Sequence, residues 1–238
     1  MKKILRLFKI YVVIMKNSLD KDLFNFKFLW VLKFFRIFFP TLWFRNNMLS
    51  RGERIKNTFE ELGPIFVKLG QTISTRKDLL PTDIAEELVK LQDKVKPFSG
   101  EEAKKIIESS LGDSIENIFE SFDIECLASA SVAQVHSAKL EGNDVIIKVL
   151  RPNIEKLIRK DIDLMYFIAK TIDKFWEESK RLKPIEIVAE YEKVIFGELD
   201  LVKEASNANL LKRNFSESSY LYVPEIYWDY TRDNVLVM

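Results

Sequence analysis

An α+β fold is predicted for this chain of 238 residues, because helical and strand-like patterns occupy different parts of it. Residues 1–120 carry a helical spacing of apolar side chains almost throughout. From Ile124 the spacing changes to that of strands, and a short turn sequence, EGND at 141–144, separates two such runs. Two long helical patterns follow before a last strand-like run. Segregated helices and strands are typical of an antiparallel sheet with helices packed against it.

Residues 51–120 are predicted to form a series of short helices. The stretch SRGERIKNTFEELGPIFVKLGQTISTR reads as a helix, a break at Gly63–Pro64 and a second helix. The next stretch, PTDIAEELVKLQDKV, keeps its apolar residues on one face. SGEEAKKIIESSLG then starts with acidic residues and ends near a glycine, as helices commonly do.

Residues 121–238 are predicted to contain the sheet. The strand-like runs are IECLASASVAQVHSAKL and VIIKVL, on either side of the EGND turn. Residues 151–179 and 184–215 return to a helical pattern. The last stretch, VPEIYWDYTRDNVLVM, is predicted to form two strands around a turn at Thr231–Asn234.

Residues 1–50 form a basic, aromatic head. Residues 1–60 hold thirteen basic and four acidic side chains, a net charge of +9, while the rest of the chain carries −8. Ten aromatic residues lie between Phe24 and Phe44, too often interrupted by charge for a membrane span. Such a segment either lies on a membrane surface or packs its aromatic side chains on the protein, and both readings stay open. No base-reading motif accompanies it, so nucleic acid is not an expected partner.

Single cysteine and histidine residues limit the chemistry. Cys126 alone excludes an internal disulfide, which fits a reducing compartment, and it reads as a small buried apolar residue. His136 alone excludes a histidine-based triad or a multi-histidine metal site, and it reads as structural.

Two spacings after residue 120 resemble the small lobe of a protein kinase. Kinases cover the phosphates of ATP with a glycine-rich loop, G-x-G-x-x-G-x-V, and place a lysine in a V-A-I-K strand. Here Val145-Ile146-Ile147-Lys148 takes the place of that strand, although Lys148 could instead be an exposed lysine on a strand face. The loop spacing is present with alanine for every glycine. Its residues, which we call the alanine loop, are Ala128, Ser129, Ala130, Ser131, Val132 and Ala133, followed by Gln134 and Val135. Alanine does not readily adopt positive φ, so the alanine loop should be stiffer and hold phosphates differently.

The tetrapeptide Lys68-Leu69-Gly70-Gln71 is unusual for a helix meant only to pack. Glycine in a helix interior costs about 1 kcal/mol relative to alanine. Gly70 therefore predicts a close approach by another backbone or by a ligand.

In their order along the chain, these motifs resemble those of the UbiB family of atypical kinases. The resemblance runs from about Arg51 to the last residue and includes VIIKVLRPNIEKLIRKDIDLM and GELDLVKEASNANLL. It implies a helical N-terminal extension joined to a kinase-like small lobe. The parts would be 1–50 (the head), 51–120 (the K-x-G-Q helices) and 121–238 (the small lobe). It further implies binding of ATP or ADP with magnesium, and a role in ubiquinone biosynthesis with pathway lipids or enzymes as partners. The location implied is peripheral, on the cytoplasmic face of a membrane.

The resemblance also assigns residues to the nucleotide site. The K-x-G-Q helix would lie across the pocket, with Lys68 and Gln71 facing it. The matching acidic motif is Glu198-Leu199-Asp200. Two acids so spaced on a helix lie about 200° apart, so a shared partner requires a helix end or a break, which Gly197 makes feasible. Glu204 resembles the glutamate that pairs with the strand lysine, here Lys148. For each acid the alternative is a solvated helix face.

The sequence stops after NVLVM, which resembles the strand leading to the hinge of a kinase. The catalytic-loop Asp and Asn and the magnesium-binding Asp of D-F-G belong to the second lobe. We therefore expect no catalytic and no metal-binding residue within this chain and no phosphoryl transfer by it alone. Three alternatives stay open: a fragment, a truncated or split gene product, or a small lobe that works with a separately encoded C-terminal lobe. The rival interpretation is a non-catalytic scaffold or membrane-surface protein that keeps the small-lobe fold.

Overall fold

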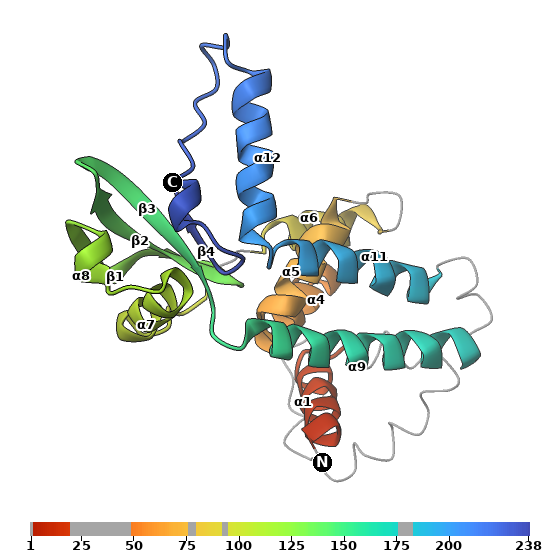
Figure 1. Cartoon of the computed structure of the whole chain (residues 1–238). Coiled ribbons are helices and arrows are strands. Elements are labelled where there is room, and N and C mark those ends of the chain that lie inside the picture. Colours follow the sequence, from red (N-terminus) through yellow and green to blue (C-terminus); the bar gives the residue numbers. More distant parts are fainter. Residues whose placement is uncertain (1, 20–48, 76–79, 92–94, 176–182) are drawn as a thin grey trace. The chain divides into compact units, whose positions relative to one another are not determined.

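The structure is a computed structural model that describes residues 2–19, 49–75, 80–91, 95–175 and 183–238 (Figure 1). The chain divides into two compact units, each discontinuous in sequence. We call them the helical unit (1–93 and 158–192) and the sheet unit (94–157 and 193–238). Helices α9 (Ile154–Phe175) and α11 (Pro184–Gly197) contribute residues to both units.

The helical unit confirms the predicted helices of the first half of the chain. Besides parts of α9 and α11 it contains α1 (Lys2–Lys16), α4 (Arg51–Leu62), α5 (Pro64–Ser74) and α6 (Thr82–Val89). Ser50 and Glu53 form a capping box at the start of α4. The predicted break lies at Gly63, whose φ of 109° favours glycine, and Pro64 begins α5.

Helix α1 is held within the helical unit by a charged side chain and two apolar ones. The Arg6 guanidinium donates to both carboxylate oxygens of Asp161 on α9, at 2.9 and 2.7 Å, and to the Leu62 carbonyl at 3.1 Å. Ile10 and Val13 are buried as well. Helix α1 is thus packed through a charged and two aliphatic side chains. The aromatic stretch from Phe24 to Phe44, to which both interpretations of the head refer, lies outside the described residues. Within the described part of the chain, every helix is too short or too polar to cross a membrane.

The sheet unit is built on four antiparallel strands in the order β1-β2-β3-β4. The strands are β1 (Ser121–Ser129), β2 (Ala133–Leu140), β3 (Asn143–Leu150) and β4 (Val235–Val237). Glu141 and Gly142 connect β2 to β3 with positive φ at both positions, 52° and 77°, as in a type I′ hairpin turn. The predicted EGND turn is therefore confirmed.

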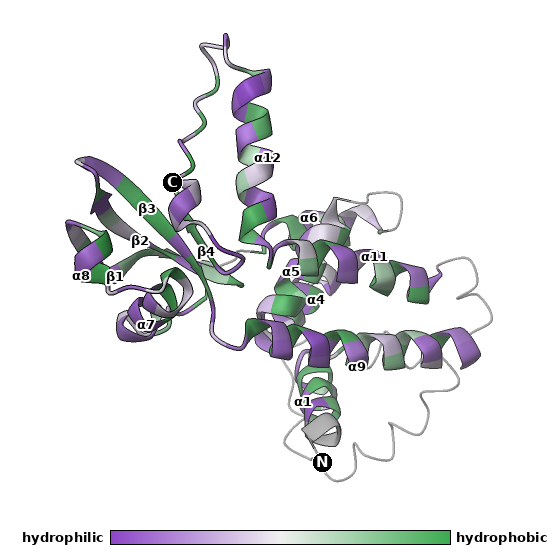
Figure 2. Cartoon of the chain, in the orientation of Figure 1, coloured by the Kyte–Doolittle hydropathy of each residue, from purple (hydrophilic) through white to green (hydrophobic). Residues whose placement is uncertain are grey.

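Helices α7 (Gly100–Leu111) and α8 (Ile115–Ile118) cover one face of this sheet. Ile107 and Ile115 pack there against β3 and β4, which are hydrophobic along most of their length (green in Figure 2). The other face contacts α12 (Leu201–Asn214) through β4. The fold is thus α+β, with the antiparallel sheet and packed helices of a kinase-like small lobe, as predicted.

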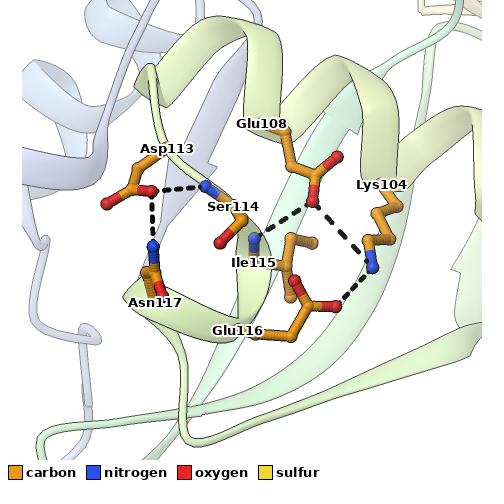
Figure 3. Close-up of polar contacts among 7 residues, drawn as sticks. All are labelled: Lys104, Glu108, Asp113, Ser114, Ile115, Glu116 and Asn117. Atoms are coloured by element: carbon orange, nitrogen blue, oxygen red, sulfur yellow. Dashed lines mark hydrogen bonds and ion pairs between the residues drawn. The ribbon is translucent and has the colours of Figure 1, made fainter.

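A polar network fixes the connection from α7 to α8 (Figure 3). Lys104 forms ion pairs with Glu108 and Glu116, the latter through a hydrogen bond. Asp113 accepts a hydrogen bond from Asn117 at 2.8 Å. That bond and one from the next backbone N–H lower the pKa of Asp113. The network holds α8 in place through surface contacts.

The last predicted strand pair forms only in part. Instead of a first strand, residues 223–227 are irregular and lead into a 3₁₀ turn, Trp228–Tyr230, before β4. Pro224 has no N–H to donate to a ladder, and a single backbone bond, from Tyr227 N to Val237 O at 3.0 Å, joins this segment to β4. Tyr227 and Tyr230 pack on the sheet core instead.

The compact units also differ from the predicted parts 51–120 and 121–238. Helix α7 belongs to the sheet unit, because Ala103 and Ile107 are fully buried and Ile107 packs on the sheet. Residues 158–192 belong to the helical unit. The prediction followed the change of hydrophobic period from Ile124 onward, which says where strands begin and not which helices pack on them.

Candidate nucleotide-binding site

The centre of the site is an ion pair between Lys148 and Glu204. Lys148 lies in β3 opposite Val135 of β2 and Leu236 of β4. Its Nζ donates to both carboxylate oxygens of Glu204, at 2.7 and 2.8 Å, although the residues are 56 positions apart. The side chains keep 26% and 40% of their surface exposed. The predicted pairing is therefore present, with both partners reachable from solvent.

The sequence around Glu204 places its carboxylate. Helix α11 ends at Gly197 and α12 begins at Leu201, so the expected break lies between them. Leu201 and Ala205 are fully buried, and Leu201 N donates to the Asp233 carbonyl at 3.1 Å, just before β4. Glu204 stands in the first turn of α12, where the helix dipole favours a negative charge.

The alanine loop lies at the end of the sheet next to Lys148. Ala133 pairs with Leu150, two residues beyond the lysine. The loop is closed by a hydrogen bond from Ala130 N to Ala133 O at 2.9 Å. None of its six residues has positive φ, so this loop does not use the conformations that glycine would add. Ser131 and Val132 are buried, while Ala128 and Ala130 are exposed.

The face of the sheet that carries Lys148 also offers an apolar surface. Side chains alternate along a strand, so Val135 and Ile146 share that face with Lys148. Val135, Ile146 and Met238 are all half-buried. A flat apolar ring could rest on them while its charged substituent reached Lys148, a combination typical of a nucleotide site.

The acidic motif has two separate roles in the structure. Asp200 is the N-cap of α12: its Oδ1 accepts from Lys203 N at 2.8 Å. It thereby fixes the start of the helix that presents Glu204. Glu198 is half-buried in the turn between α11 and α12.

The K-x-G-Q motif lies in α5 of the helical unit. A Cβ on Gly70 would stand 2.4 Å from Leu91 Cδ1 and 2.5 Å from Phe59 Cδ2. The close approach predicted for Gly70 is thus made by apolar side chains of its own unit, not by a ligand or a backbone. The Gln71 amide donates to the Leu91 carbonyl at 3.1 Å, and Lys68 is half-buried. A contact of Lys68 with Glu198 or Asp200 would join the two units and stays a prediction.

His136 is fully buried and structural. Its Nδ1 lies 2.9 Å from the Asp123 carbonyl and its Nε2 lies 2.9 Å from the Gln134 amide. Cys126 is half-buried and not buried, because it lies where β1 departs from regular pairing with β2. In the described part of the chain, no three His, Cys, Asp or Glu side chains gather where a metal ion could bind.

One residue at the site was not predicted. Arg151, directly after β3, hydrogen-bonds the alanine loop with its side chain. The only signal in the sequence was the dipeptide Arg151-Pro152 at the end of a strand, because the residue before a proline is held in an extended conformation.

A four-stranded sheet whose central lysine meets a helix glutamate beside a short loop defines the small lobe of a kinase-like protein. The chain belongs to the ABC1 atypical kinase-like family, whose domain model matches residues 90–238. It is 51% identical over its whole length to "Probable protein kinase UbiB" of Marinobacter nauticus. It is 47% identical over 98% of its length to the protein of the same name from Pseudomonas fluorescens. The expected membership in the UbiB family is confirmed.

The chain spans 44% of the length of each of these relatives and corresponds to their N-terminal part. A solved structure, the complex of Rv3197 with erythromycin from Mycobacterium tuberculosis, has a TM-score of 0.45 and 25% sequence identity to this chain. The match covers 74% of this chain and 44% of that one.

Proposed function

We propose that this protein binds ATP or ADP with magnesium in its sheet unit, as part of a UbiB-type atypical kinase or ATPase that supports ubiquinone biosynthesis. The observation that carries the proposal is the half-exposed Lys148–Glu204 pair beside the alanine loop. The kinase name of the relatives supports the reaction class, and the UbiB name supports the pathway.

Each part of the site has a role in this proposal. Lys148 supplies a positive charge to the nucleotide's phosphates, and Glu204 holds its Nζ in place. The alanine loop, from Ala128 to Ala133, covers the phosphates, and Val135, Ile146 and Met238 contact the base. Magnesium neutralises the phosphate charge when bound. By resemblance to the family, Lys68, Gln71, Glu198 and Asp200 belong to the same site, although the Gln71 amide is already bonded within the helical unit.

Replacement of the strand lysine tests nucleotide binding. We expect Lys148→Met to weaken binding of Mg-ATP and Mg-ADP by roughly tenfold or more, because a hydrogen bond to a charged group is lost. Isothermal titration calorimetry on the whole chain measures this affinity. Lys105→Met is the matched control, since Lys105 is exposed on α7, which covers the opposite face of the sheet. Binding that survives Lys148→Met would contradict the site, and no binding by the unmodified chain would favour the scaffold interpretation.

We also propose that the basic head contacts a membrane surface, at the cytoplasmic face, where lipids or enzymes of the pathway would be partners. The charge of +9 over residues 1–60 supports an attraction to anionic lipid. Because α1 is packed in the helical unit, the whole chain is the right test object and a deletion is not. Lys27→Glu, Lys33→Glu and Arg36→Glu together should reduce co-sedimentation with anionic vesicles.

This attraction should weaken with salt, since charges are screened beyond about 10 Å at 0.1 M. The control is the same charge change at exposed lysines of α9, namely Lys156, Lys160 and Lys170. If both triple variants bind vesicles equally, the aromatic stretch is not the contact.

A further inference from the structure

Arg151 connects the alanine loop to two other segments of the sheet unit. Its Nε donates to the Ala130 carbonyl at 3.0 Å and its Nη2 to Ser129 Oγ at 2.6 Å. The same Nη2 donates to the Lys96 carbonyl at 3.1 Å. The guanidinium carbon stands 5.7 Å from the ring centre of Phe98. One side chain therefore joins the end of β1, the loop and the segment before α7.

The backbone of Arg151 is also hydrogen-bonded to the alanine loop. Its N–H donates to the Val132 carbonyl at 2.8 Å, so the residue is tied to the loop before its side chain begins. Pro152 follows it and restricts its backbone to extended conformations. A planar guanidinium can then bond two acceptors at defined angles, which the ammonium group of a lysine does not reproduce.

The segment before α7 does not depend on Arg151 for its position. Gln134 already binds that segment through Phe98, whose N–H donates to Gln134 Oε1 at 3.1 Å and whose carbonyl accepts from Nε2 at 3.4 Å. What depends on the Arg151 side chain is the hydrogen bonding of the Ser129 hydroxyl and of the Ala130 carbonyl. Within the loop, the backbone bond from Ala130 to Ala133 supplies local closure only.

We propose that Arg151 is a positioning residue that sets the conformation of the alanine loop and thereby the affinity for the nucleotide's phosphates. A glycine-rich loop adapts to phosphates through its own backbone freedom, whereas this loop has alanine at those positions and no positive φ. The guanidinium therefore adds a restraint from outside the loop to the backbone bonds at Ala130 and Val132. The expected effect of Arg151 on nucleotide affinity rests on the proposed nucleotide site, whereas its expected effect on the loop conformation does not.

The test compares Arg151→Lys with the unmodified chain. Arg151→Lys keeps the charge and removes the planar donors. We expect amide hydrogen exchange at residues 130–133 to become roughly tenfold faster in the nucleotide-free chain, since hydrogen bonds to a charged group are lost. Exchange in the middle of β2 and β3 should not change. Mg-ADP affinity should fall by roughly tenfold in the same variant.

Arg232→Lys is the matched control. Arg232 also bonds backbone carbonyls in the sheet unit, those of Asp229 at 3.0 Å and Thr231 at 2.7 Å, but it touches no loop residue by these bonds. It should change neither the exchange of residues 130–133 nor the affinity. A uniform rise in exchange over the whole sheet, unchanged exchange in Arg151→Lys, or unchanged affinity despite a loosened loop would each overturn the proposal. If the unmodified chain binds no Mg-ADP, the proposed function fails, and the exchange rates alone decide whether Arg151 sets the loop.

Discussion

Two ion pairs in this molecule have similar geometry and different surroundings. Arg6 and Asp161 in the helical unit are 155 positions apart, and Lys148 and Glu204 in the sheet unit are 56 apart. In each pair a cation bonds both oxygens of one carboxylate. The Asp161 side chain is 3% exposed, however, whereas that of Glu204 is 40% exposed.

The difference separates a pair with a nearly buried carboxylate from one whose carboxylate a ligand could reach. Arg6 also bonds the Leu62 carbonyl and stands 5.7 Å from the ring centre of Phe66. Its side chain is 25% exposed, much like the 26% of Lys148, so the two pairs differ in the burial of the carboxylate and not of the cation. Lys148 meets its carboxylate on a face that remains half-open, next to a loop and an apolar surface. A closed pair can only hold segments together, whereas an open pair can exchange its carboxylate for a phosphate.

The largest effect on stability is expected at the closed pair. Asp161→Asn replaces the nearly buried carboxylate that pairs with Arg6 by an amide, and should lower the free energy of unfolding by about 3 kcal/mol. Urea unfolding of the whole chain measures this loss. The control, Glu61→Gln, removes the exposed pair of Lys16 with Glu61 and should cost under about 1 kcal/mol. Equal losses of unfolding free energy in the two variants would contradict the structural role given to the Arg6–Asp161 pair.

A smaller effect on stability, with a larger one on binding, is expected at the open pair. Glu204→Gln should change the free energy of unfolding by under about 1 kcal/mol, because water reaches both groups. It should weaken Mg-ADP binding by roughly tenfold, since Lys148 loses the charged partner that holds its Nζ. Unfolding and calorimetry on one preparation give both numbers. A stability loss as large as that of Asp161→Asn would mean that the second pair is structural too.

The open pair could be predicted from sequence, and the closed one could not. Lys148 lies in a strand pattern that follows a spaced loop, and Glu204 was assigned as its partner by the resemblance to the UbiB family. Arg6 is one of many basic residues in the head, and nothing near Asp161 marks it as its partner. Arg151 was missed for a related reason, because its hydrogen bonds depend on the three-dimensional course of a loop.

Local sequence patterns also do not identify which residues pack against one another. The close approach predicted at Gly70 is present, but it is made by the side chains of Phe59 and Leu91 and not by a ligand or a backbone. Only the folded helical unit brings these side chains together. Likewise, the onset of strands near residue 121 was visible, whereas the attachment of α7 to the sheet depends on the burial of Ile107. Hydrophobic spacing identifies which face of a helix is buried and leaves open what buries it.

The discontinuous course of the chain has a consequence for anyone who wishes to shorten it. The segment matched by the family model, residues 90–238, contains residues 158–192, which fold with the helical unit. Ile158, Ile162 and Met165 of α9 are buried there. A clone that starts at residue 90 would leave these side chains in water, as an apolar strip prone to aggregation. The family's characteristic segment is therefore a unit of sequence recognition, but it is not a unit of autonomous folding.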